Sequence, residues 1–190
     1  MNTFSKVVVF SGHMIDRPDR PKPRFPPSKE KIVAQNLADQ LQTWNIGKDD
    51  LAICGGACGG DILFAEACIN LGTSVKLYIA LPETEFIARS VYIANTDWEE
   101  RYHKLSNHPQ VSKEYQQDYR GKLPEDISVF ARNNLWMIDT ATRIVSPGNL
   151  FALLVWDEKP TGDGPGGTSD FAYKINKHGG HIAIINPTKL

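Results

Sequence analysis

Glycine is unevenly distributed in this 190-residue chain, and its clustering suggests where chemistry could occur. Of the 15 glycines, eight lie in two short stretches, residues 55–60 and 162–167. Glycine lets a backbone approach a ligand closely, and the N–H groups at a helix start favour an anion. Because each stretch leads into a helical pattern, both are predicted to bind phosphate groups. The first stretch matches neither GxGxxG nor Walker A spacing, and the alternative is a tight turn for the first stretch or a surface crossover for the second, in which glycine only permits packing.

Residues of these stretches and of neighbouring loops form the predicted ligand site. Asp61 begins a helix and is predicted to cap it, with binding of a ribose hydroxyl as the alternative. Arg17, Arg20, Lys22 and Arg24 lie in a proline-rich loop and could clamp phosphate oxygens. The predicted ligand-binding residues are Ser11, Gly12, Arg24, Gly55, Gly56, Ala57, Cys58, Gly59, Gly60, Asp61, Arg89, Arg132, Asn133, Gly166, Gly167 and Thr168. For Arg132 and Asn133, surface capping or pairing is an equal alternative.

Three carboxylates are candidates for catalysis at the same site: Asp61, Glu66 and Asp170. A positioned carboxylate can attack or stabilise the ribosyl cation that forms when an N-glycosidic bond breaks. Asp61 and Asp170 are also common residue types at helix starts, and Glu66 could face either the pocket or solvent. No specific motif singles out one of the three.

Apolar patterns predict the elements that position these residues. Continuous apolar runs are typical of buried strands, and apolar residues three and four apart indicate helices. Residues 13–27 contain five prolines and are excluded from helix and central strand. Polar residues 106–124 are predicted to form an excursion or short helix. The expected strands are 6–10, 51–54, 75–80, 150–156 and 181–185, and the expected helices are one opened by Ser28 and those over 61–70, 84–105, 127–142 and 168–178.

The alternation of strands and helices predicts a single doubly wound, Rossmann-like α/β domain over residues 1–190. Its sheet should be mainly parallel, with about five or more strands covered on both faces. Ligands of such sheets bind at the carboxyl ends of the strands. The loops after residues 10, 54, 80 and 156 should therefore meet at one edge and form one pocket.

Composition narrows the function classes. The chain has 21 Lys+Arg and 22 Asp+Glu, a net charge of −1, which argues against general nucleic-acid binding. No apolar run approaches the ~20 residues of a membrane helix, and the N-terminus lacks the pattern of a signal peptide. Three cysteines without CxxC spacing predict buried thiols in a reducing cytoplasm, and neither they nor the five histidines suggest a metal site.

The motifs resemble those of the SLOG superfamily, Rossmann-like nucleotide-binding proteins that include the cytokinin-activating phosphoribohydrolases and several presumed ligand sensors. The resemblance rests on Phe10-Ser11-Gly12, the Gly-Gly-Ala-Cys-Gly-Gly-Asp loop at 55–61, the helix with Arg132-Asn133 and Met137-Ile138-Asp139, and Gly166-Gly167-Thr168. It implies a nucleotide or nucleotide-derived ligand at those turns and self-association as a homodimer.

The chain departs from the hydrolase members of that family. Their Pro-Gly-Gly-x-Gly-Thr-x-x-Glu turn is shortened here to Pro165-Gly-Gly-Thr168, and Phe171 stands where the glutamate would be. We therefore expect a sensor or binding protein for a small nucleotide-like ligand, without a further cofactor. The alternative is an enzyme of the N-glycosidic bond, either a nucleotide phosphoribohydrolase or a protein similar to nucleoside 2-deoxyribosyltransferases.

Overall fold

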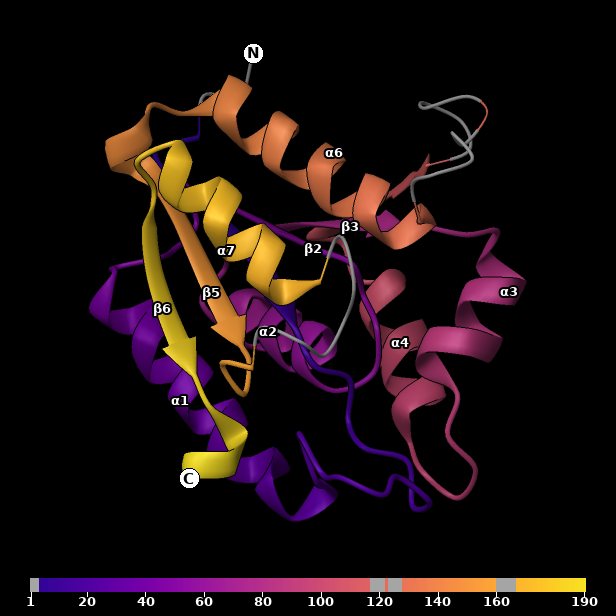
Figure 1. Ribbon diagram of the computed structural model, residues 1–190. Helices are drawn as coiled ribbons and strands as arrows, with labels where there is room; N and C mark the ends of the chain where they lie inside the picture. Colours follow the sequence, from indigo (N-terminus) through magenta and orange to yellow (C-terminus); the bar gives the residue numbers. More distant parts are fainter. Residues whose placement is uncertain (1–3, 117–121, 123–127, 160–166) are drawn as a thin grey trace.

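A run of β-branched residues near the amino terminus forms the central strand of the sheet, β1 (Val7–Gly12). The computed structural model describes residues 4–116, 122, 128–159 and 167–190 (Figure 1). Val7, Val8, Val9 and Phe10 have no exposed surface, because successive side chains of β1 pack against opposite faces of the sheet. Val8 and Phe10 belong to one apolar core, and Val7 and Val9 to the other.

The described strands form one six-stranded sheet in the order β4-β3-β2-β1-β5-β6. All of its pairings are parallel, which confirms the predicted doubly wound α/β class. The chain runs from β1 outward to β4 and then returns to the other side of β1 as β5. This reversal creates a crevice between the carboxyl ends of β1 and β5, where open α/β sheets bind ligands. The other strands are β2 (Leu51–Cys54), β3 (Ser74–Ile79), β4 (Val111–Tyr115), β5 (Leu150–Val155) and β6 (His181–Ile185).

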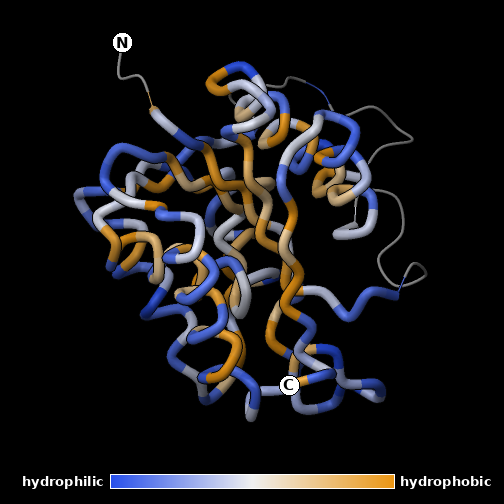
Figure 2. Tube along the Cα trace, turned by 90° about the vertical axis from the view of Figure 1, so that its left-hand side faces the viewer, coloured by the Kyte–Doolittle hydropathy of each residue, from blue (hydrophilic) through white to orange (hydrophobic). Residues whose placement is uncertain are grey.

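Helices cover both faces of the sheet, and the apolar residues concentrate along the strands between them (Figures 1 and 2). On one face lie α1 (Glu30–Thr43), α2 (Gly60–Asn70) and α4 (Trp98–Ser106). On the other lie α6 (Val129–Ile144) and α7 (Thr168–Lys177). Short helical turns complete the described chain: η1 (Pro27–Lys29), α3 (Glu83–Phe86), the π-helical turn η2 (Ile87–Val91), η3 (Pro147–Asn149) and η4 (Pro187–Lys189).

The prediction of an excursion or short helix over residues 106–124 is wrong for Val111–Tyr115, because β4 extends the sheet there, at its edge beside β3. Residues 117–121, 123 and 124 of that range lie outside the residues that the structure describes. The sequence Val-Ser-Lys-Glu-Tyr has no continuous apolar run, since an edge strand is only partly covered. Its charged residues form ion pairs with neighbouring elements instead. Lys113 lies 2.8 Å from Glu83 on α3, and Glu114 lies 3.2 Å from Lys76 on β3.

The single helix predicted over residues 84–105 is also wrong. The chain forms α3 and η2, leaves helical geometry at Tyr92, and resumes as α4 at Trp98. Asn95 adopts a positive φ of 62°, which a continuous helix excludes. The apolar spacing of Trp98, Tyr102 and Leu105 was predicted as helical and is buried in α4.

Smaller differences concern helix starts and ends. Ser28 does not open a helix as its cap; it lies inside η1, and α1 begins at Glu30. Ser128 does cap α6, because its hydroxyl accepts the Ala131 N–H at 3.0 Å. Within the described ranges, none of the helices has both the length and the apolar character to cross a membrane.

Candidate functional site

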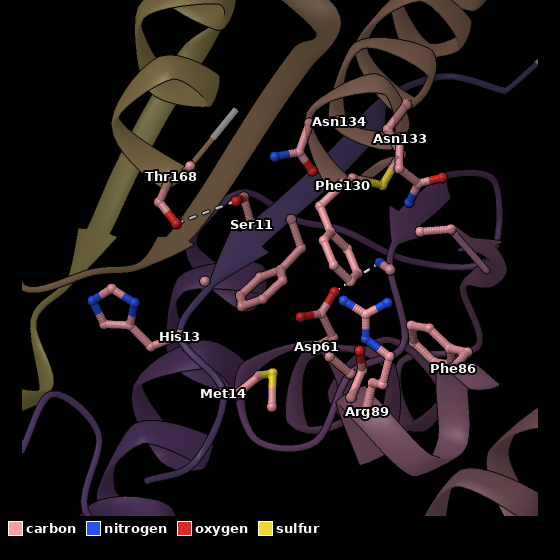
Figure 3. Close-up of a pocket in the computed structure, with 18 of the residues that line it drawn as sticks. Ser11, His13, Met14, Asp61, Phe86, Arg89, Phe130, Asn133, Asn134 and Thr168 are labelled. Atoms are coloured by element: carbon pink, nitrogen blue, oxygen red, sulfur yellow. Dashed lines mark hydrogen bonds between the residues drawn. The ribbon is translucent and has the colours of Figure 1, made fainter. Parts of the chain in front are cut away.

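A cavity of about 400 Å³ opens at the carboxyl edge of the sheet, at the crevice between β1 and β5 (Figure 3). Its walls come from the loops after β1, β2 and β3 and from the first turns of α6 and α7. The parallel sheet thus brings together segments that are far apart in the sequence. The predicted ligand-binding residues that line this cavity are Ser11, Gly12, Arg24, Gly55, Ala57, Asp61, Arg89, Asn133, Gly167 and Thr168.

Other predicted site residues lie outside the described lining. These are Gly56, Cys58, Gly59, Gly60, Arg132, Glu66 and Asp170. Gly166 lies outside the residues that the structure describes. The glycine-rich loop after β2 therefore faces the pocket with only part of its length.

Packing explains two of the glycines in that loop. Gly59 adopts a φ of 87°, and a Cβ there would lie 2.3 Å from the backbone nitrogen of Ile15. A Cβ on Gly60 would lie 2.7 Å from the ring of Phe10. These glycines let α2 start against the segment that follows β1, which is the packing alternative stated above.

The N–H groups of the loop after β2 are largely used within the protein. The Gly55 N–H donates to Asp61 Oδ1 at 2.7 Å. The Cys58 N–H donates to the Ser90 carbonyl at 2.8 Å, and the Gly60 N–H to the His13 carbonyl at 3.2 Å. The start of α2 is thus occupied by protein acceptors, which leaves fewer donors for a phosphate than the sequence suggests.

The prediction that Asp61 caps α2 is wrong, because its side chain reaches back to the loop before the helix. The N-cap of α2 is Gly59, which makes no side-chain cap bond. Asp61 is buried, with 7% of its surface exposed. Burial raises the pKa of its carboxyl to about 7, although hydrogen bonds from the N–H groups of Gly55 and Gly56 oppose the shift. A carboxyl that titrates near neutral pH inside a pocket is a candidate functional group.

The other two catalytic candidates are engaged elsewhere. Glu66 on α2 pairs with Arg101 on α4, with Oε2 2.6 Å from Nη2. Arg101 also binds Glu30 on α1, so this cluster joins three helices. Asp170 pairs with Lys174 one turn further along α7. Of the three candidates, only Asp61 lines the pocket.

A buried cluster, His13–Arg24–Asp157, holds the proline-rich loop against the sheet. The Asp157 side chain is fully buried and accepts from Arg24 Nε and Nη2, both at 3.2 Å. His13 Nε2 lies 3.1 Å from Asp157 Oδ1. Burial alone would raise the pKa of Asp157, but the bonds from Arg24, His13 and the Lys159 N–H outweigh it and hold this pKa well below its usual range.

The proline-rich loop supplies fewer ligand-facing cations than its composition suggests. Arg20 and Arg24 line the pocket, but Arg24 is bound to Asp157. Arg20 Nε lies 3.2 Å from Asp16 Oδ1, and 42% of its side chain is exposed. Arg17 bonds to the Tyr92 carbonyl at 3.2 Å. Arg20 is therefore the more available of the two cations from this loop.

Arg132 and Asn133 brace the structure from the first turns of α6. Asn133 Nδ2 donates to the Tyr78 carbonyl at the end of β3, at 2.7 Å, and its oxygen accepts from Gln116. Arg132 Nε donates to Gln116 Oε1 at 2.6 Å. Asn133 thus reaches the pocket wall, whereas Arg132 makes the pairing stated as its alternative.

The sequence interpretation missed the aromatic lining of the pocket. Phe10, Phe86 and Phe130 line it, and Phe130 on α6 is 40% exposed. The Arg89 guanidinium on η2 lies 5.7 Å from the Phe130 ring centroid and bonds to Glu85 at 2.9 Å. Exposed aromatic and guanidinium groups can stack on planar rings. His13 and Asp157 were also missed as partners, although each lies within two residues of the carboxyl end of a strand.

Comparison of the sequence with protein-family models and with curated proteins finds no match.

Proposed function

We propose that this pocket binds a nucleotide or nucleotide-derived phosphorylated ligand and that the chain acts as a sensor or binding protein. The proposal rests on one observation: the same cavity is lined by an aromatic wall, Phe86 and Phe130, and by Thr168 at the start of α7. This cavity lies where the strand order of the sheet reverses. A nucleotide needs both kinds of surface, a flat apolar one for its base and a donor-rich one for its phosphate.

The start of α7 supports a phosphate subsite. Ser11 Oγ lies 3.4 Å from Thr168 Oγ1, and both residues are more than nine-tenths buried. This separation is long for a hydroxyl pair, so each hydroxyl can turn toward a ligand oxygen at little cost. The positive end of the α7 dipole favours an anion there, and the partly exposed Arg20 adds a positive charge to the same cavity.

The opposite side of the cavity supports a base subsite. Phe130 presents the exposed aromatic surface there, backed by the buried Phe86 and beside Arg89 (Figure 3). Aromatic and guanidinium faces stack on any nucleobase without reading its hydrogen-bonding edge. We therefore expect the fold to accept several bases at this subsite.

Membership of the SLOG superfamily is part of this proposal. Each of the four motifs that carry the resemblance contributes at least one described residue to the pocket, namely Ser11, Asp61, Asn133 and Thr168. The strand order, with its reversal at β1, is compatible with the Rossmann-like sheet that the resemblance implies.

Thermal-shift and calorimetric titrations with AMP, ATP, ADP-ribose and NAD test the proposal. A ligand that binds only the folded state stabilises it by RT ln(1 + [L]/Kd), so the melting temperature rises with ligand concentration and keeps rising above Kd. We expect such a rise, and a saturable calorimetric isotherm, with at least one of the four. The absence of binding by all four in calorimetry would contradict the proposal.

Thr168→Val is expected to weaken binding of that nucleotide about tenfold or more, because a hydroxyl bond to a charged group contributes about 1.5–3 kcal/mol. Valine keeps the shape of threonine, and only a long bond to Ser11 is lost, so the unfolding free energy should change by less than about 1 kcal/mol. Calorimetric titration measures the affinity. Thr43→Val on the exposed face of α1 is the control and should leave the affinity unchanged.

A second candidate function is cleavage of an N-glycosidic bond, and the placement of Asp61 favours it. This carboxyl is buried at the pocket and titrates near pH 7, as a group that exchanges protons or stabilises a ribosyl cation should. Release of free base from AMP, followed by chromatography and abolished in Asp61→Asn, would support the enzyme. Binding without base release would support the sensor.

A further inference from the structure

Asp61 is the feature of the pocket that phosphate binding leaves unexplained. Of the described residues that line the cavity, it is the only one that carries a carboxylate. A carboxylate accepts hydrogen bonds and repels phosphate, so it cannot belong to a phosphate subsite when ionised. The N–H groups of Gly55 and Gly56 offset only part of its desolvation penalty, so a further partner in the pocket should be a hydrogen-bond donor rather than a phosphate.

The carboxylate is held in one orientation by the loop before α2. Oδ1 accepts the Gly55 N–H at 2.7 Å, and the Gly56 N–H also bonds to the side chain. A Cβ on Gly55 would lie 3.1 Å from Oδ1, so a larger residue there would crowd the carboxylate. An acceptor fixed by its supporting backbone is suited to select one donor position of a ligand.

The location of Asp61 matches the middle of a nucleotide. In Figure 3 its carboxylate is drawn just below the Phe130 ring, with Phe86 on one side and the Ser11 and Thr168 hydroxyls on the other. With phosphate at the α7 start and base at the aromatic wall, the sugar is the part of the ligand that passes Asp61. The sugar hydroxyls of a ribonucleotide are donors, and carboxylates accept from them strongly.

We infer that Asp61 is a specificity-determining residue that accepts a hydrogen bond from a ribose hydroxyl, so that the pocket selects ribonucleotides over their deoxy forms. This inference rests on the proposed nucleotide-binding function. A site built to accept a hydroxyl discriminates against the analogue that lacks it, because its buried acceptor is then left unpaired. Asp61 thereby also keeps phosphate away from the start of α2.

The test is a double-mutant cycle between protein and ligand. AMP, 2′-deoxy-AMP and 3′-deoxy-AMP, and the same three forms of ATP, are titrated calorimetrically into wild type, Asp61→Asn and the control Asp49→Asn, whose side chain is exposed. Asparagine can still accept the Gly55 N–H, so the loop should keep its conformation. Circular dichroism spectra check that each variant is folded.

We expect the wild type and Asp49→Asn to bind the ribonucleotide at least tenfold more tightly than one of the deoxy forms. In Asp61→Asn that ratio should fall below about threefold, because affinity for the ribonucleotide drops while affinity for the deoxy form stays within about twofold. A ratio that is equal in wild type and Asp61→Asn would overturn the inference.

The binding preferences of the wild type alone provide a second test of the inference. If it binds AMP or ATP and both deoxy forms equally well, the inference is wrong and the proposed function stands. If it binds no nucleotide at all, both are wrong. The two failures are therefore distinguishable even if Asp61→Asn does not fold.

Discussion

Asp157→Asn is expected to lower the free energy of unfolding by about 3 kcal/mol, because removing one partner of a buried ion pair leaves the other charge uncompensated. The Asp157 side chain is fully buried, and only 11% of the Arg24 side chain is exposed. Asparagine keeps one acceptor for His13 or Arg24 but cannot balance the guanidinium charge. Urea unfolding at pH 7, followed by circular dichroism, measures the loss.

Asp19→Asn is the matched control, because Asp19 lies exposed in the same proline-rich loop. It should change the unfolding free energy by less than about 0.5 kcal/mol. An Asp157→Asn variant within 1 kcal/mol of wild type would contradict the role given to the His13–Arg24–Asp157 cluster.

Lowering the pH should reduce the difference in unfolding free energy between wild type and Asp157→Asn. The pKa of Asp157 is lowered in the folded state, so its contribution to stability is fully present above its unfolded pKa near 4. That contribution is lost as the pH falls through the lower, folded pKa. The wild type should therefore lose its advantage below about pH 4, whereas Asp157→Asn has no such carboxyl to protonate.

The stability of this cluster also bears on the proposed function, because His13 and Arg24 line the pocket. Asp157 does not line it, yet it positions both side chains from the carboxyl end of β5. Asp157 is thus a positioning residue for the wall that the proline-rich loop contributes.

The alternation of apolar strands with helical segments was enough to predict the fold class. Strands such as Val7–Phe10 are buried on both faces, so their residues are apolar without interruption and stand out in the sequence. β4 was missed because it lies at the edge and its Lys113 and Glu114 pair with neighbours at the surface. The break between η2 and α4 depends on a positive φ at Asn95, which apolar spacing does not reveal.

Topology alone could predict which residues meet at one edge of the sheet, but it could not predict their side-chain partners. The carboxyl-edge rule placed Ser11, Asp61 and Thr168 in one cavity. The sequence does not reveal that Asp61 occupies the N–H of Gly55, since that contact depends on how the loop folds back. Nor does it reveal that Glu66 turns to Arg101, because its partner lies on another helix.

Asp61→Asn is expected to stabilise the protein at pH 8 by about 4 kcal/mol. Burial raises the pKa of this carboxyl to about 7, from an unfolded value near 4, and each unit corresponds to about 1.4 kcal/mol. Because the folded state binds the proton more tightly than the unfolded state, wild-type stability falls as the pH rises from about 4 to 7. The gain in Asp61→Asn should therefore vanish near pH 4 and be complete above pH 7.

Urea unfolding of wild type, Asp61→Asn and Asp49→Asn between pH 4 and pH 8 measures this dependence. Asp49→Asn carries the same charge change at an exposed position, so its stability should follow that of wild type within about 0.5 kcal/mol at every pH. If Asp61→Asn is less stable than wild type at pH 8, the carboxylate is a structural anchor for the loop rather than a buried charge that the fold tolerates.

The two expectations for Asp61→Asn have opposite signs, and their combination is informative. If Asp61 only braces the loop before α2, the Asp61→Asn protein should be less stable and should bind the ligand more weakly. If Asp61 is retained for ligand recognition, the variant should be more stable but should discriminate less between ribonucleotide and deoxynucleotide, because functional groups are kept at a cost to the folded state. Gain of stability at pH 8 together with loss of the ribose preference would therefore identify Asp61 as a recognition group of the pocket.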